Sequence, residues 1–122
     1  GERTAGQMPA LYAAADMLAW PAVREAFGMA ILEAQATGLP VVAGRAGGVA
    51  DTVRDGETGL LAPEGDPAAF ADAVRELLAD PARRRSMGGR AIAVVERDHA
   101  MNAAGRAIDA ALARACAGRR AA

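Results

Sequence analysis

The chain has 122 residues and a formal net charge of −1 at pH 7, which excludes the electrostatic footprint of a protein that binds nucleic acid or an anionic membrane surface. Its length allows one domain with a modest core, and its single cysteine excludes an internal disulfide and suits a reducing compartment. No apolar run reaches membrane-spanning length. Every basic side chain is arginine, which, together with much Ala and Gly, indicates GC-rich coding and a bacterial source. We therefore expect a cytoplasmic protein with no nucleic-acid partner.

Short apolar runs alternate with helical patterns along the chain. Three runs predict strands, at residues 17–20, 41–43 and 59–62. They are apolar throughout, as is typical of strands covered on both faces of a parallel sheet. A helix from about residue 29 to 37 is expected between the first two strands. The order of elements predicts an α/β fold with a short parallel sheet of about three strands flanked by helices.

The second half of the chain predicts three helices. Asp66-Pro67 and Asp80-Pro81 each place an N-cap residue before proline at the first helical position. Apolar residues then recur at helical spacing, at Phe70, Val74, Leu77 and Leu78 and again at Met87, Ala91, Val94 and Val95. Asp98 is expected to cap a last helix whose buried face would hold Met101, Ala104, Ile108, Ala111 and Leu112.

Two carboxylates, Glu25 and Glu33, stand eight residues apart on either side of a glycine turn that opens the helix expected from about residue 29 to 37. The first N–H groups of a helix have no internal partner and carry partial positive charge, so they can bind a diphosphate if no Cβ blocks its approach. The backbone that would supply these groups is Phe27, Gly28, Met29 and Ala30.

The position of Glu33 on this helix suits a sugar ligand. It lies four residues after Met29 and shares its face of the helix, roughly 6 Å further along the axis. An ionised glutamate can accept hydrogen bonds from both hydroxyls of a ribose. Glu25 precedes the turn, where it could bind donor-sugar hydroxyls or stabilise positive charge at the anomeric carbon. The pattern therefore favours a nucleotide-sugar site. By themselves, two glutamates at this spacing fit ordinary solvent-exposed positions equally well.

The wider string around the glutamates is more specific. It begins with Leu32-Glu-Ala-x-Ala-x-Gly-x-Pro-Val-Val-Ala43 and continues with Gly47-Gly48 and Asp55-Gly-x-x-Gly-Leu-Leu-x-Pro63. It ends with Asp66, Asp80-Pro81, Arg84 and Met87-Gly88. In order and spacing this string resembles the donor-binding half of retaining glycosyltransferases with two facing Rossmann-like domains, the GT-B fold of family 4 (group 1). The resemblance runs from about residue 11 to 95.

This resemblance implies the C-terminal half of a GT-B enzyme, a partial Rossmann-like domain. The reaction would move a sugar from a nucleoside diphosphate sugar to an acceptor hydroxyl with retention of configuration. Glu25 would be the catalytic residue, and the donor would be held by Phe27, Gly28, Met29, Ala30, Glu33, Gly47 and Gly48. The resemblance implies neither a cofactor nor a metal, and the lack of an Asp-x-Asp pair agrees with a metal-free reaction.

The same resemblance places the acceptor site in an N-terminal domain that residues 1–122 do not contain. We therefore expect that this chain alone transfers no sugar, and that any attachment to the inner membrane would come through the missing domain. A half domain whose sheet ends at residues 17–20 would expose a strand edge, which is a template for pairing with another chain. Self-association into a homodimer, through this edge or the last helix, is the expected result.

Two other functions fit the same residues. One is a different enzyme on the same fold, such as a nucleotide-sugar 2-epimerase, or a phosphorylase, which would need a cofactor lysine that this chain lacks. The other is a module that binds a nucleotide sugar without catalysis. The donor sugar, its base, the acceptor and the pathway are not indicated by the sequence.

Several smaller features allow more than one interpretation. Gly47-Gly48 could let the backbone approach the donor or could simply form a tight turn. Trp20 is expected in the core rather than stacked on a base, and Arg45 at the surface rather than on phosphate. Asp55-Gly56 is typical of a helix end with glycine in the left-handed conformation. Residues 83–85, all arginine, are expected on a solvated helix face.

Overall fold

The computed structural model describes residues 1–99 and Arg114. Its centre is an open parallel sheet whose three strands lie in the order of the chain, as predicted: β1 (Leu18–Trp20), β2 (Val41–Arg45) and β3 (Gly59–Pro63). In the register of the sheet, Val41 lies between Leu18 and Gly59. β2 and β3 run slightly further than the apolar pattern predicts.

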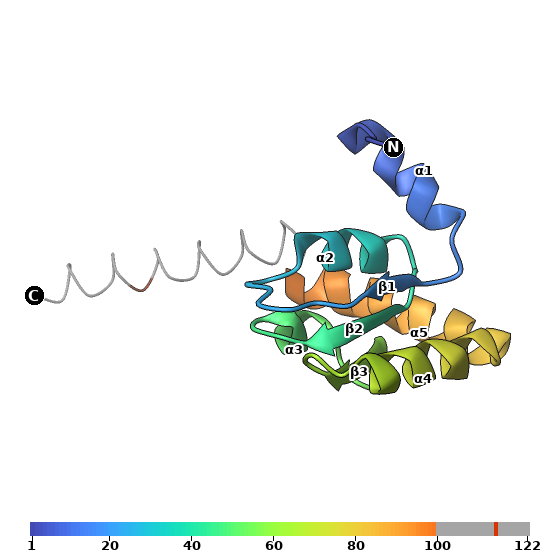
Figure 1. The fold of residues 1–122 in the computed structure, drawn as a ribbon. Helices are drawn as coiled ribbons and strands as arrows, with labels where there is room; N and C mark the ends of the chain where they lie inside the picture. Colours follow the sequence, from blue (N-terminus) through green and yellow to red (C-terminus); the bar gives the residue numbers. More distant parts are fainter. Residues whose placement is uncertain (100–113, 115–122) are drawn as a thin grey trace, which may run out of the picture.

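Helices connect and cover these strands. A 3-10 turn (Ala5–Gln7) leads into α1 (Met8–Ala13); α2 (Met29–Ala36) connects β1 to β2, and the short α3 (Val49–Thr52) connects β2 to β3. After β3 come α4 (Pro67–Leu78), α5 (Pro81–Val94) and a π-helical turn, η2 (Val95–His99). In Figure 1, α2 lies on one side of the sheet, α4 and α5 lie on the other, and α1 stands apart from the strands. None of the helices within the described residues is long and apolar enough to cross a membrane.

The central strand β2 is buried on both faces. Val41 and Ala43 pack toward α2 and α3, in a cluster with Ile31, Val49 and Val53. Val42 faces the other way, in a cluster completed by Leu60, Leu77 and Met87. Successive side chains of a strand point to opposite faces, so one continuous apolar run supplies two core layers.

β1 lies at the edge of the sheet, where it pairs with β2. Ala19 is exposed, whereas Leu18 and Trp20 are half-buried against the core. Self-association through this edge stays a prediction.

The two predicted N-caps are confirmed. The Asp66 carboxylate accepts a hydrogen bond from the Ala69 N–H at 3.0 Å, and the Asp80 carboxylate accepts one from the Arg83 N–H at 2.9 Å. Each aspartate satisfies one of the free donors at its helix start. α4 and α5 therefore begin where the sequence places them.

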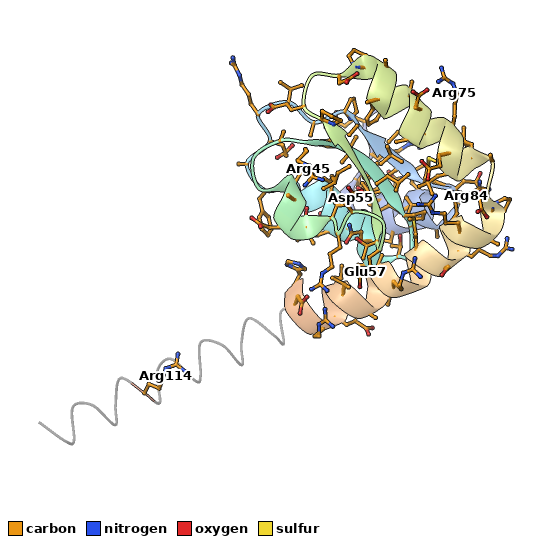
Figure 2. The ribbon with its side chains drawn as sticks, turned by 90° about the horizontal axis from the view of Figure 1, so that it is seen from below. Arg45, Asp55, Glu57, Arg75, Arg84 and Arg114 are labelled. Carbon is orange, nitrogen blue, oxygen red and sulfur yellow. The ribbon has the colours of Figure 1, made fainter. Side chains whose placement is uncertain are left out.

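The expectation of a solvated arginine face is wrong at Arg84. Its Nη1 donates hydrogen bonds to the carbonyls of Leu77 at 2.6 Å and Leu78 at 2.7 Å, and only 15% of the side chain is exposed. The last carbonyls of a helix have no internal partner, and a guanidinium can satisfy two at once. Arg84 of α5, labelled in Figure 2, thus caps the C-terminal end of α4.

Most of the predicted last helix lies outside the described residues, including Met101, Ala104, Ile108, Ala111 and Leu112. Asp98 belongs to η2. Its carboxylate accepts hydrogen bonds from Arg97 and Arg54. The Arg97 hydrogen bond is the largest cause that lowers the pKa of Asp98.

Two adjacent glycines of α5 should respond in opposite ways to alanine. A Cβ on Gly88 would lie 2.0 Å from the Gly38 carbonyl oxygen, whereas a Cβ on Gly89 would meet nothing within 4 Å. Gly88→Ala should lower the free energy of unfolding by about 2 kcal/mol, because helix and loop must separate. Gly89→Ala should raise it by roughly 0.5–1 kcal/mol, because it restricts the unfolded chain. Urea denaturation of both variants checks this, and equal losses would contradict it.

Candidate functional site

Glu25 is held at both carboxylate oxygens by its own loop. Oε1 accepts a hydrogen bond from the Gly28 N–H at 3.2 Å, and Oε2 accepts one from the indole Nε1–H of Trp20 at 3.3 Å. The side chain is half-buried. The contact with Trp20 joins the end of β1 to the loop, so the carboxylate has a defined position beside the start of α2.

Gly28 is the N-cap of α2 and has the left-handed backbone that glycine adopts readily, with φ 79°. A Cβ at this position would lie 2.9 Å from Cδ1 of Ile31. The first helical hydrogen bond runs from the Ile31 N–H to the Gly28 carbonyl, so the N–H groups of Met29 and Ala30 lie ahead of it. The Gly28 N–H itself is donated to Glu25. Phe27 and Met29 are exposed, so this helix start is open to solvent.

Glu33 lies on the exposed side of α2 and contacts Tyr12 of α1. The Tyr12 hydroxyl donates to Glu33 Oε2 at 3.4 Å. Burial of the phenol, followed by the charge and hydrogen bond of Glu33, raises the pKa of Tyr12 above its ordinary value. Tyr12 is therefore a protonated donor at neutral pH, and it orients one oxygen of the carboxylate.

A cavity of about 540 Å³ opens between α1 and α2 next to this pair. Apolar and aromatic groups line most of it, with one carboxylate and one guanidinium: Arg3, Ala5, Met8, Pro9, Tyr12, Glu33, Ala36 and Thr37. This volume falls within the range of roughly 300–1,000 Å³ that is usual for small-molecule sites. Glu33 thus stands between the helix start and a cavity of suitable size.

Gly47 and Gly48 pack directly on the Glu25 loop. A Cβ on Gly47 would lie 1.8 Å from the Glu25 carbonyl oxygen, and a Cβ on Gly48 would lie 2.3 Å from that of Ala26. The Gly48 N–H also donates to the Ala26 carbonyl at 3.1 Å. Contact with the neighbouring backbone therefore accounts for both glycines, and their part in donor binding stays a prediction.

The interpretations of Trp20 and Arg45 are confirmed. Trp20 packs against the core cluster of β2. Arg45 is half-exposed and pairs with Asp55 at 3.2 Å, and both are labelled in Figure 2. Gly56 has the expected left-handed backbone, with φ 77°. It does not end a helix, however, because α3 stops at Thr52 and Gly56 belongs to the turn that leads into β3.

Three partners of the site are absent from the sequence-based prediction. Trp20 and Tyr12 hold the two glutamates, and Glu64 accepts a hydrogen bond from the Arg24 N–H at 2.9 Å. The Tyr12 and Glu64 contacts span 21 and 40 residues, so no local pattern indicates them. Residues 1–99 contain no group of three or more His, Cys, Asp or Glu side chains arranged to hold a metal ion.

Comparison with known proteins covers most of the chain. The family model for glycosyl transferases group 1 matches residues 1–94, so the match begins earlier than the string of motifs. The D-inositol 3-phosphate glycosyltransferase of Corynebacterium efficiens is 47% identical over 96 residues, which are 79% of this chain and 22% of that enzyme. The chain thus spans about a fifth of the length of this curated relative.

Solved structures agree with the sequence match. The sucrose-phosphate synthase of Thermosynechococcus elongatus superposes with a TM-score of 0.87 at 33% identity, over 97% of this chain and 30% of that one. HepE of Anabaena, solved with UDP-glucose, superposes with a TM-score of 0.82 at 29% identity, over 93% of this chain and 31% of that one. Both are longer chains that contain the three-stranded parallel unit. By the match over residues 1–94, the chain belongs to the group 1 glycosyl transferase family.

Proposed function

We propose that this chain is the donor-binding part of a glycosyltransferase that moves a sugar from a nucleoside diphosphate sugar to an acceptor hydroxyl with retention. The observation that carries the proposal is the joint placement of Glu25, Gly28 and α2. The catalytic candidate is hydrogen-bonded to the first residue of the helix start that would hold the diphosphate. Family membership and a neighbour solved with UDP-glucose support the donor class.

In this arrangement the parts of the donor follow one another along α2. The diphosphate lies at the N–H groups of Met29 and Ala30, and the departing charge is stabilised there as the sugar bond breaks. The ribose lies at Glu33, whose Oε1 would accept from its hydroxyls while Tyr12 engages Oε2. The cavity between α1 and α2 is where the base would fit. Glu25 lies on the other side of the turn, at the sugar.

Glu33→Ala in the complete protein should weaken donor binding by about 1.5–3 kcal/mol, the usual contribution of hydrogen bonds to a charged group. Turnover at saturating donor should change less than affinity, because the ribose is remote from the bond that breaks. Calorimetric titration with UDP- and GDP-sugars measures the affinity, and a sugar-transfer assay measures turnover. Tyr12→Phe is the matched control: it keeps the ring, removes the hydroxyl donor and should weaken binding less.

The same assays separate the alternatives. Binding of a nucleotide sugar by the complete protein without transfer would favour a non-catalytic module, and inversion at C2 of the donor would favour a 2-epimerase. The 122-residue chain alone should transfer no sugar, because the acceptor is expected to bind a second domain. Turnover by this chain above a Glu25→Ala control would contradict that expectation.

A further inference from the structure

Arg24, immediately before Glu25, has an unusual backbone. Its φ is 56°, and it is the one non-glycine residue with a positive φ among those the structure describes. The left-handed region places the Cβ of an L-residue too close to its own backbone, so a side chain rarely adopts it without support. Such conformations persist where the surroundings impose them, often at functional sites.

Glu64 supplies that support from a distant part of the chain. Its Oε1 accepts a hydrogen bond from the Arg24 N–H at 2.9 Å, and a bond to an ionised acceptor is stronger than one between neutral groups. Glu64 follows the last residue of β3 and stands two positions before Asp66, the cap of α4. A strand end and a helix start therefore fix the backbone from which its side chain reaches Arg24.

The next two residues of the loop are held by the turn that follows β2. Gly47 lies against the Glu25 carbonyl, and the Gly48 N–H donates to the Ala26 carbonyl at 3.1 Å. The segment after β3 therefore binds the residue before Glu25, Arg24, and the turn after β2 binds the residue that follows it, Ala26. Without the Glu64 contact, Arg24 would relax toward the ordinary region, and such a rotation next to Glu25 would redirect its carboxylate.

We propose that Glu64 is a positioning residue for Glu25: its carboxylate holds Arg24 in the left-handed conformation and thereby places the Glu25 carboxylate for reaction. This inference rests on the proposed function of Glu25. Glu64 itself is exposed and acts on the reaction through the backbone of Arg24, whose N–H it binds.

Glu64→Ala in the complete protein should lower kcat about ten-fold, because small misplacements of a catalytic group are costly, with KM for the donor changed less than about three-fold. Glu64→Gln keeps an oxygen acceptor and should retain most of the activity. Glu57→Ala is the matched control, another loop glutamate, and should leave kcat unchanged. In an Arg24→Gly background the effect of Glu64→Ala should largely disappear, because glycine adopts a positive φ without help.

Hydrogen exchange provides a readout that does not depend on activity. Peptides that contain the Arg24 amide should exchange faster in Glu64→Ala than in wild type or in Glu57→Ala. Unchanged exchange would mean that Glu64 does not hold the Arg24 backbone, and would overturn the proposal. Faster exchange with wild-type kcat would overturn the positioning role and leave the proposed function intact. Altered exchange in a protein that transfers no sugar would overturn the proposed function, and with it the role of Glu64 in transfer.

Discussion

Glu25→Ala in the complete protein should lower the turnover of sugar transfer about a hundred-fold or more, the usual effect of removing one preorganised electrostatic group from a transition state. Positive charge develops at the anomeric carbon as the bond to the diphosphate breaks. A carboxylate that Trp20 and Gly28 already hold in place can stabilise that charge without reorganising. Donor affinity should change much less, which distinguishes Glu25 from Glu33.

The measurement is kcat under saturating donor and acceptor, with donor affinity determined by calorimetry. Glu2→Ala, at an exposed position outside the site, serves as the control for a general loss of charge. Glu25→Gln removes the charge but keeps the shape, and should recover little of the lost turnover if charge is what matters. Negligible effects from Glu25→Ala and Glu33→Ala alike would refute the assignment of both residues.

Gly47→Ala should be among the most destabilising single substitutions in this chain, with a loss of about 3 kcal/mol or more in the free energy of unfolding. Two causes add. Its φ of 50° is unfavourable for alanine, and the new Cβ would lie 1.8 Å from the Glu25 carbonyl oxygen. Backbone cannot rotate away as a flexible side chain can, so the loop that carries Glu25 must move.

Gly56→Ala isolates the conformational part of that loss. Gly56 also has a positive φ, 77°, but a Cβ there would meet nothing within 4 Å. Its substitution should lower the free energy of unfolding by only about 1–2 kcal/mol. Chemical denaturation of both variants gives the comparison. Equal losses would mean that the contact between Gly47 and the Glu25 loop contributes nothing.

Local patterns in the sequence were enough to predict much of the fold. Apolar runs placed all three strands, because a parallel strand covered on both faces must be apolar throughout. Asp66 and Asp80 marked the starts of α4 and α5, because an N-cap acts on donors only a few residues away. The start of α2 was readable from the glycine turn, because Gly28 directly precedes the helix.

Predictions that depended on distant partners were less successful. Arg84 was expected in solvent, yet it binds the last carbonyls of the preceding helix. Gly56 was expected to end a helix, yet α3 stops at Thr52 and Gly56 belongs to a turn closed by the hydrogen bond from the Thr58 N–H to the Arg54 carbonyl. In each case the residue's environment is set by how two elements pack, which a local pattern does not contain.

The candidate site divides in the same way. The sequence by itself determined its reactive groups, because the glutamate pair, the glycine turn and the helix are contiguous over residues 25–37 and need only local geometry to meet. Tertiary structure alone decided what holds them: Tyr12 on Glu33, the Gly47-Gly48 turn under the loop, and Glu64 on Arg24. These contacts join segments 21 to 40 residues apart. The Tyr12 contact depends on the packing of α1 against α2. The other two form because the parallel sheet brings the carboxyl ends of its strands, and the loops that follow them, to one edge.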